Sequence, residues 1–295
     1  MDFLLPKEYV QTLKTLFMNA PVSNLSDVET VIKEDLGNSI DELFSEFEKT
    51  PLGSASLAQC HKARLRSTGQ IVAVKVQHKR VLQSAHKDVK IMELGIEIAD
   101  KIFPEFKLKW LPKLTKENLF RELDFRVEYE NTIKAQRLYK GYNWLIIPNA
   151  YKDLTSERVI TMDYVDGTYV DKLPDDYSQK KKQQIIHRLQ ELYFDMMFFK
   201  GFVHCDPHPG NLLVTKDDRI VLIDHGLYQT FSESVQYNFT SLWLSIIKAD
   251  HSKIKKYARR LGVENEMMLS SMDSFDKLVI IYFFDKKSLL QWVQF

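Results

Sequence analysis

Cysteine is scarce in this sequence, and its two cysteines, Cys60 and Cys205, lie far apart. A disulfide-stapled scaffold is therefore excluded, and reducing surroundings are expected. Long apolar runs are also missing, because the longest, residues 278–284, is far shorter than the roughly 20 residues of a membrane helix. The opening MDFLLPKEYV has neither a signal peptide's basic flank nor an arginine-rich presequence, so we expect a soluble chain unless a targeting segment precedes it.

An excess of one charge is lacking too. Lys and Arg number 41 and Asp and Glu 40, which gives a formal net charge of +1. This balance gives no overall attraction to nucleic acid or to anionic membrane, and we expect no nucleic-acid partner. The basic run at residues 180–182 is interpreted as the solvated start of a helix. With 295 residues, of which 44% are hydrophobic, the chain can bury one or two sizeable cores.

Helical and strand patterns alternate in the first part of the chain. Apolar residues recur at helical spacing over residues 6–47, where Ser26 and Glu29 have the form of a capping box. Small residues without an apolar period predict a loop over 50–59. The alternation in QIVAVKVQ predicts a strand over 70–77, with three valines on one face. Further helices are expected at 86–103 and 115–138, and further strands at 144–151 and 157–165.

From Lys181 onward the pattern is mainly helical. An apolar stripe at helical spacing ends at Gly201, a helix-terminating signal, and is interpreted as core. The segments NLLVT and RIVLID flank Asp217-Asp218 and predict a short hairpin. Helices are expected at 235–247 and 254–261. The sequence therefore predicts an α+β chain with a small mixed lobe followed by a mainly helical lobe, and a cleft between lobes is the usual place for a site.

Lys75 stands inside the apolar strand, where an ammonium is costly to bury unless an anion or a carboxylate meets it. It shares a face with Ala73, whose small side chain leaves room for a flat ring, so an adenine with its phosphates would fit. The alternative is an edge-strand lysine that reaches solvent, because the match to V-A-x-K is short.

A loop of small residues lies upstream of this strand, at Gly53, Ser54, Ala55 and Ser56. Such a loop lets backbone N–H groups approach phosphate oxygens. The spacing G-x-G-x-x-G is missing, so an ordinary turn would have the same composition.

The string GFVHCDPHPGN, residues 201–211, contains Asp206 and, five positions later, Asn211; Asp224 follows in LIDHG. Protein kinases use this layout: the first aspartate accepts the hydroxyl proton, and the asparagine and the strand-ending aspartate bind Mg²⁺. Oxygen ligands suit this ion, and the hairpin is expected to bring Asn211 and Asp224 to the same end. Together with the loop and V-A-V-K, this order of motifs indicates a phosphotransfer site.

Zinc is a competing interpretation of the same string, through His204, Cys205 and His208. No C-x-x-C or H-E-x-x-H spacing supports it, and no fourth ligand is obvious. We instead expect His204 to support the loop by hydrogen bonds and Cys205 to point away from the site.

Five segments resemble the UbiB/AarF atypical protein-kinase-like family: PLGSASLAQCHKA, VAVKVQH, RELDFRVEYEN, GFVHCDPHPGN and VLIDHGLYQ. The resemblance covers about residues 4–262 and implies a bilobal kinase-like fold. The expected parts are a helical extension at 1–49, an N-lobe at 50–166 and a C-lobe at 167–295, with the catalytic loop at 204–211 and the D-x-G motif at 224–226.

The resemblance also implies ATP and Mg²⁺ as cofactors. By match, Ala55 and its neighbours belong to the nucleotide loop, Lys75 contacts phosphate, and Asp206 holds the catalytic-base position. Asn211 and Asp224 take the metal positions, and Asp163, Tyr164 and Val165 fall where adenine is expected. The family further implies mitochondrial residence, with a role in lipid and ubiquinone metabolism or in mitochondrial membrane upkeep. Lipid or membrane-associated substrates and mitochondrial proteins are the partners expected on this ground.

Two interpretations differ on the partner of Lys75. Ordinary kinase spacing points to Glu93 or Glu97, on the helix after the strand. The family pattern has E-x-D followed by a glutamate, here Glu122, Asp124 and Glu128. We favour Glu128, with a helical insert between.

The sequence departs from the expected pattern in three places. The family's Lys-x-Gly-Gln motif upstream of the small-residue loop is missing, so gating by that segment is not expected. Many Ser/Thr kinases have a lysine two residues after the catalytic aspartate, where this chain has His208. No Ala-Pro-Glu segment follows Asp224, so the usual peptide platform is not expected.

The sequence favours an ATP- and Mg²⁺-binding atypical kinase or ATPase of mitochondria. Two alternatives stay open at this point. One is a nucleotide-binding regulator or scaffold without phosphotransfer, and the other is a small-molecule kinase, which also carries H-x-D-x-x-x-x-N.

Overall fold

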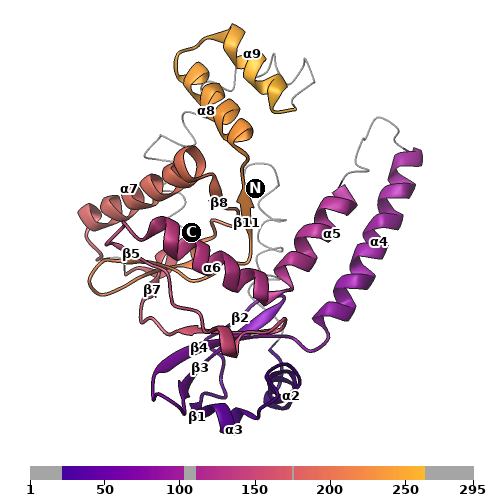
Figure 1. Cartoon of the computed structure of the whole chain (residues 1–295), viewed down its shortest axis with the longest axis vertical. Coiled ribbons are helices and arrows are strands. Elements are labelled where there is room, and N and C mark those ends of the chain that lie inside the picture. The colour runs from indigo at the N-terminus through magenta and orange to yellow at the C-terminus, as the bar shows by residue number, and fades with distance from the viewer. Residues whose placement is uncertain (1–21, 103–110, 175, 263–295) are drawn as a thin grey trace. The chain divides into compact units, whose positions relative to one another are not determined.

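The computed structural model describes residues 22–102, 111–174 and 176–262 (Figure 1). Its contacts divide the chain into two compact units. The first unit runs to Gln136 and includes Pro148–Val165, and the second contains Arg137–Ile147 and the chain from Asp166 onward.

The first unit is built on an antiparallel sheet in the order β1-β3-β4-β6, with β2 paired to β3 (Figure 1). The strands are β1 (Phe44–Phe47), β2 (Gly53–Ser54), β3 (Ala58–Leu65), β4 (Ile71–Gln77) and β6 (Val159–Asp163). Because β4 pairs along its length with both β3 and β6, it is an interior strand.

One face of this sheet packs on helix α2 (Leu25–Leu36). The three valines of β4, Val72, Val74 and Val76, are fully buried there together with Val31 and Ile32 of α2. Burying a valine side chain contributes about 2 kcal/mol, so this face supplies much of the unit's stability. The alternating pattern predicted for residues 70–77 is therefore confirmed.

The opposite face of the sheet packs on helix α6 (Phe125–Tyr139). Phe125 and Ile160 are buried there with Met162, and Ala73 packs partly buried against them. Lys75 lies on this face, because side chains alternate along a strand.

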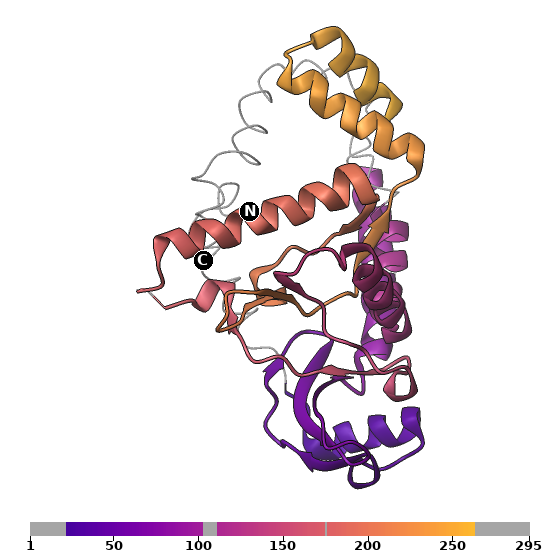
Figure 2. The ribbon, with the colours of Figure 1, turned by 60° about the vertical axis from the view of Figure 1, so that its left-hand side comes forward.

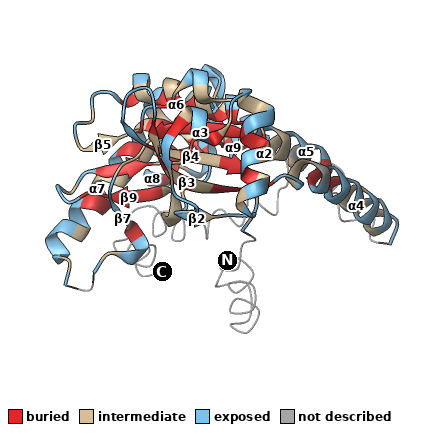
Figure 3. Cartoon of the chain, turned by 90° about the horizontal axis from the view of Figure 1, so that it is seen from below, coloured by how far each residue is buried: buried red, intermediate tan, exposed pale blue. Residues whose placement is uncertain are grey.

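Helices α4 (Val81–Ile102) and α5 (Leu111–Glu122) lie side by side (Figure 1). Most of α4 is exposed, whereas strand β4 is largely buried (Figure 3). The single helix predicted over 115–138 is wrong, because the chain is broken at Leu123 and Asp124 between α5 and α6.

The second unit contains a four-stranded sheet in the order β5-β10-β9-β7. Its strands are β5 (Leu145–Ile146), β7 (Thr168–Tyr169), β9 (Leu212–Val214) and β10 (Ile220–Leu222). Strands β9 and β10 form the predicted hairpin, and Asp218 in its turn has a φ of 62°. A separate antiparallel pair joins β8 (Phe202–His204) to β11 (Tyr228–Thr230).

The main helices of this unit are α7 (Gln179–Asp195), α8 (Glu233–Ile247) and α9 (His251–Arg260). Helix α7 continues as the π-helix η3 (Met196–Lys200) and ends at Gly201, whose φ of 60° suits glycine. Helices α8 and α9, orange to yellow, lie side by side (Figure 2). Short 3₁₀ turns of this unit are η2 (Val170–Lys172) and η4 (Pro209–Asn211), and η1 (Lys152–Leu154) belongs to the first unit.

Three local predictions near the start of the described chain need correction. After α2 and α3 (Ile40–Leu43), residues 44–47 form β1 and not a helix. The N-cap of α2 is Asn24, which accepts from Asp27 N, while Ser26 donates to Asn24; the capping box lies instead at Ser39 and Glu42. The predicted 50–59 loop includes β2 and the first residues of β3. The part of the predicted helix before residue 22 lies outside the described residues.

The mixed helix and sheet content confirms the α+β class. Among the described residues, no helix combines the length and the apolar character needed to cross a membrane.

Candidate functional site

Lys75 and Glu128 form an ion pair within the first unit. Lys75 Nζ lies 3.1 Å from Glu128 Oε1 and 2.9 Å from Oε2. The Glu128 side chain is 2% exposed and that of Lys75 22%. Lys75 Nζ also lies 5.0 Å from the centroid of the Phe125 ring. A carboxylate this deeply buried requires a cation or several donors, and the Lys75 ammonium meets it.

The edge-strand explanation of Lys75 is wrong. In the sheet register Lys75 stands opposite Cys60 of β3 and Ile160 of β6, so its strand has neighbours on both sides. Burial raises the pKa of the neighbouring Cys60 thiol to about 11, although the Lys75 charge lowers it. Lys75 therefore lies on an interior strand of the sheet and not on an edge strand.

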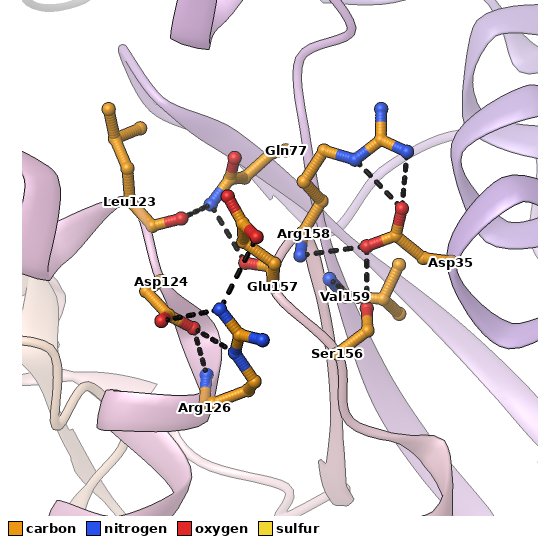
Figure 4. Close-up of polar contacts among 9 residues, drawn as sticks. All are labelled: Asp35, Gln77, Leu123, Asp124, Arg126, Ser156, Glu157, Arg158 and Val159. Carbon is orange, nitrogen blue, oxygen red and sulfur yellow. Dashed lines mark hydrogen bonds and ion pairs between the residues drawn. The ribbon is translucent and has the colours of Figure 1, made fainter.

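Hydrogen bonds at the junction between α5 and α6 hold Glu128 close to Lys75. Gln77, at the end of β4, donates from Nε2 to the carbonyls of Leu123 and Glu157 (Figure 4). Phe125 N donates to the Glu157 carbonyl at 2.9 Å. Because β4, the junction and the turn before β6 share these bonds, α6 begins at a fixed distance from Lys75.

A second group of contacts in the same region ties α2 to the start of β6 (Figure 4). Asp35 accepts from the backbone N–H and the guanidinium of Arg158 and from Ser156 Oγ. The Asp35 side chain is only 10% exposed. A paired and largely buried carboxylate of this kind fixes the helix on the sheet.

The other acidic residues considered at the sequence level lie elsewhere. Glu93 is half-buried and Glu97 exposed, both on α4. Asp124 pairs with Arg126 at the start of α6, where its Oδ1 accepts from Arg126 N and Nε at 3.0 and 2.8 Å. Glu122 is exposed at the end of α5.

The small-residue loop is bonded to itself and to the sheet. Gly53 and Ser54 pair with β3, and the Ala55 N–H donates to the Ala58 carbonyl at 2.8 Å. The Ala55 carbonyl accepts from the His78 ring at 2.9 Å. Both backbone groups of Ala55 are thus used within the unit. Within the described part of the chain, the N–H groups of Ser56 and Leu57 have no such partner, so they are the candidates to meet an anion.

The residues expected to meet adenine follow β6. Asp163 accepts side-chain hydrogen bonds from Gln70 Nε2 at 2.8 Å and Tyr151 Oη at 2.7 Å. The N–H groups of Asp163 and Tyr164 donate to Asn149 and Ile71. Among the described residues the N–H of Val165 has no such acceptor, so of the three it is the one open to a ligand.

The second unit brings Asp206, Asn211 and Asp224 together; we call these three residues the Asp206 cluster. Asn211 Nδ2 donates to the Asp206 carboxylate at 2.9 Å and to its carbonyl at 3.1 Å. Asn211 precedes β9 and Asp224 follows β10, and Ile223 N donates to the Asn211 carbonyl at 3.1 Å. The expected placement of Asn211 and Asp224 at one end of the hairpin is therefore correct.

Two histidines, His204 and His208, hold the backbone around this cluster by hydrogen bonds. His204 is buried, and its Nε2 donates to the Asp224 carbonyl at 2.9 Å while its Nδ1 accepts from Asp206 N at 3.3 Å. Burial lowers the pKa of His204, which keeps the ring neutral and suits one donating and one accepting nitrogen. His208 Nδ1 accepts from Gly210 N at 2.9 Å, so it shapes the turn before Asn211.

The zinc interpretation has no support in this geometry. No group of three or more His, Cys, Asp or Glu residues in the described ranges is placed to hold a metal. The exposed Cys205 bonds through its thiol to the Val203 carbonyl.

Two supporting residues were not predicted. His225 is buried, contacts the Leu222 carbonyl through Nε2 and the Tyr228 hydroxyl through Nδ1, and stacks on the Tyr228 ring. His78 holds the small-residue loop, as described above. The only sequence signal for either was its position next to a motif residue.

The chain is similar to proteins of one known family. A family model described as ABC1 atypical kinase-like domain matches residues 15–258. AarF domain-containing protein kinase 1 of Gallus gallus is 46% identical over 268 residues, covering 89% of this chain and 51% of its own length. AarF domain-containing kinase 1 of Drosophila melanogaster is 43% identical over 274 residues, covering 90% and 52%. The chain thus spans about half the length of the curated relatives it matches.

A solved structure gives the same fold. The complex of Rv3197 with erythromycin from Mycobacterium tuberculosis matches with a TM-score of 0.69 and 24% identity, over 88% of this chain and 66% of that one. With the family match, this confirms the kinase-like fold expected from the sequence.

Proposed function

Because this chain belongs to the ABC1 atypical kinase-like family, we propose that it binds ATP with Mg²⁺ and transfers the terminal phosphoryl group to an acceptor or to water. The observation that carries the proposal is the Asp206 cluster, in which the Asn211 amide is already bonded to the Asp206 carboxylate at 2.9 Å. Phosphoryl transfer depends mainly on positioning and charge neutralisation, so a preformed cluster of this kind is what the reaction needs.

In this proposal Asp206 is the catalytic residue. Its exposed carboxylate accepts the proton of the attacking hydroxyl as the new oxygen–phosphorus bond forms and the bond to the departing ADP breaks. The hydrogen bond from Asn211 Nδ2 orients Asp206 for this role. His204, held neutral by burial, supports the backbone of both Asp206 and Asp224.

Asn211 and Asp224 would hold Mg²⁺. Their donor set fits the ion, since an amide oxygen and a carboxylate at one hairpin end suit a metal that takes oxygen ligands and keeps several waters. The Asn211 amide oxygen accepts no hydrogen bond from the residues that the structure describes. When bound, Mg²⁺ supplies neutralisation of phosphate charge.

The first unit contributes the nucleotide-binding groups of the proposal. Lys75, which Glu128 orients, would bind phosphate oxygens together with the loop Gly53, Ser54, Ala55 and Ser56. Ala73 and the 163–165 segment face adenine. Support comes from the interior position of Lys75 and from the N–H groups of Ser56, Leu57 and Val165 noted above.

The acceptor is proposed to be other than an ordinary peptide. Only residues 225–231 separate Asp224 from Ser232, the N-cap of α8, and they include β11. A peptide platform does not fit in so short a segment. On the family resemblance we propose a lipid or membrane-associated acceptor, or a protein partner, in mitochondria.

ATP turnover with Mg²⁺ tests the proposal, measured with and without liposomes and with candidate acceptors, in the wild type and in Asp206→Asn. Catalysis predicts that the variant binds nucleotide as tightly as the wild type and loses at least about hundredfold in turnover. Equal, near-zero rates with intact binding would instead favour the regulator or scaffold. Turnover only with a small hydroxylated acceptor would favour a small-molecule kinase, and no binding of ATP by the wild type would overturn the proposal.

A further inference from the structure

His78 lies at the centre of a chain of hydrogen bonds behind the small-residue loop. Its Nε2 is 2.9 Å from the Ala55 carbonyl, and its Nδ1 is 2.8 Å from Ser23 Oγ. His78 is buried, with an exposed fraction of only 9%. Its own backbone N–H donates to the Leu57 carbonyl at 3.0 Å. One residue therefore holds the loop at two carbonyls, one on each side of Ser56.

The chain of hydrogen bonds continues beyond Ser23 through buried polar groups. Ser23 N donates to Gln59 Oε1 at 2.7 Å, and Gln59 Nε2 meets His61 Nε2 at 2.8 Å. His61 Nδ1 in turn meets the Glu48 carbonyl at 2.8 Å. Gln59 is 2% exposed and His61 is fully buried. Burial makes each of these bonds costly to leave unmade, so the path is rigid.

The acceptors fix which nitrogens carry protons. A carbonyl only accepts, so His78 Nε2 donates to Ala55, and in the neutral ring this leaves His78 Nδ1 to accept from the Ser23 hydroxyl. The same reasoning makes His61 Nδ1 the donor to Glu48 and leaves its Nε2 to accept from Gln59. Burial lowers the pKa of His61, in agreement with a neutral ring. Every polar group of the path thus has a partner of the right kind.

This path determines the conformation of the loop. With its N–H bonded to Ala58 and its carbonyl to His78, Ala55 has no backbone group left to reorient. The N–H groups of Ser56 and Leu57 then point from a turn whose two carbonyls are already held. A donor pair that is ordered beforehand binds an anion more tightly, since no conformational entropy is lost on binding.

We propose that His78 is a positioning residue for the nucleotide, which acts by holding the Ala55 and Leu57 carbonyls so that the Ser56 and Leu57 N–H groups are ready to bind phosphate. This inference rests on the proposed function, because it takes ATP as the ligand. The inference assigns this positioning role to a residue that directly follows the end of β4.

Two substitutions separate the two sides of the ring. In His78→Gln the side-chain amide nitrogen reaches the place of Nε2 and can still donate to Ala55. In His78→Asn the shorter side chain reaches only the place of Nδ1, so it keeps the contact with Ser23 and loses the one with Ala55. The two variants are matched in polarity, and both leave Lys75 and the Asp206 cluster untouched.

The experiment measures Kd for a fluorescent ATP analogue with Mg²⁺, KM and kcat for ATP, and hydrogen exchange of the 52–57 amides without nucleotide. We expect His78→Asn to raise Kd and KM about fivefold to tenfold with kcat within about twofold, and to speed exchange in the loop. His78→Gln is expected to stay within about twofold of the wild type in all four. Ser23→Ala, which removes the partner of Nδ1, should fall between them.

The outcomes are distinct. If the wild type binds nucleotide and His78→Asn binds it equally tightly, the positioning role is wrong while the proposed function stands. If both variants lose affinity for ATP equally, and urea unfolding shows that both lose the same free energy of unfolding, His78 has only a structural role and the inference is overturned. If the wild type binds no ATP, the proposed function fails first, and the inference falls with it.

Discussion

Lys75 and Glu128, 53 residues apart in the chain, meet at 2.9 Å with the Glu128 side chain almost entirely buried. The two residues come from the interior strand β4 and the first turn of α6, which the contacts of Gln77 hold together. Breaking one half of such a pair leaves an uncompensated buried charge, which costs more free energy than the pair contributes.

The first prediction follows from this asymmetry. Lys75→Met should lower the free energy of unfolding by about 3 kcal/mol, because Glu128 keeps its burial and loses the Lys75 ammonium. The double variant Lys75→Met with Glu128→Leu should regain most of that loss, but neither should bind nucleotide. Urea unfolding and a fluorescent ATP analogue measure the two effects.

Lys79→Met is the control for the loss of a lysine. Its pair with Asp27 is at 3.5 Å and more than a third exposed on both sides, so the change in stability should be less than about 1 kcal/mol. If the double variant Lys75→Met with Glu128→Leu were as unstable as Lys75→Met alone, the buried-charge explanation would be wrong.

Some elements could be predicted from the sequence because their signal is local. The valine alternation of β4, the hairpin turn at Asp217-Asp218 and the helix end at Gly201 each depend on neighbouring residues, and all three are present. Strand β3 was missed, since AQCHKARL has no β-branched residue and most of its buried positions are filled by small or polar side chains such as Gln59 and His61. The break between α5 and α6 was missed because neither glycine nor proline marks it.

The site itself was only partly accessible to the same reasoning. The positions of Asp206, Asn211 and Asp224 could be predicted because their spacing is fixed by one loop and one hairpin. The roles of His78 and Gln77 depend on which carbonyls the folded chain brings to them, which no local pattern specifies. Likewise, spacing alone suggested Glu93 or Glu97 as the partner of Lys75, and only the family pattern pointed to Glu128.

A second prediction concerns the metal. Asp224→Asn should raise the Mg²⁺ concentration for half-maximal ATP turnover by more than tenfold, because a carboxylate ligand becomes a neutral amide. Asp166→Asn, at an exposed acidic residue, is the control and should leave the Mg²⁺ dependence unchanged. Equal Mg²⁺ dependence in the two variants would remove Asp224 from the proposed metal site.

A third prediction uses the two cysteines as probes. Cys205 is exposed, whereas burial raises the pKa of Cys60 to about 11, so thiolate forms at Cys60 only at strongly alkaline pH. A thiol reagent at pH 8 should therefore label one site rapidly in the folded protein and two in urea. Cys205→Ser should abolish the rapid phase, and persistence of that phase would contradict the described environment of Cys60.

A fourth prediction concerns acid stability. Burial lowers the pKa of both His61 and His204 from about 6.5, so the unfolded chain binds protons at a higher pH than the folded one. Their contribution to stability is complete above about pH 6.5 and is lost as the pH falls below it. The free energy of unfolding should decrease by more than about 1 kcal/mol from pH 7.5 to 5.5.

Variants assign this acid effect to individual residues. His204→Gln keeps a donor for the Asp224 carbonyl but cannot titrate, so it should show a weaker pH dependence. His187→Gln, at an exposed position on α7, should behave as the wild type. An unchanged slope in His204→Gln would show that another group is responsible.

The fifth prediction tests the turn between Asp206 and Asn211. A Cβ at Gly210 would lie 2.9 Å from His208 Nδ1, the atom that accepts from Gly210 N, so Gly210→Ala must displace the ring or the turn. Because Asn211 is the next residue and bonds to Asp206, a shift of a few tenths of an ångström should lower kcat about tenfold. At Gly141 a Cβ would meet nothing within 4 Å, so Gly141→Ala is the matched control. A loss of kcat in both variants, or in neither, would mean that the tight packing of His208 against Gly210 does not position Asn211 for catalysis.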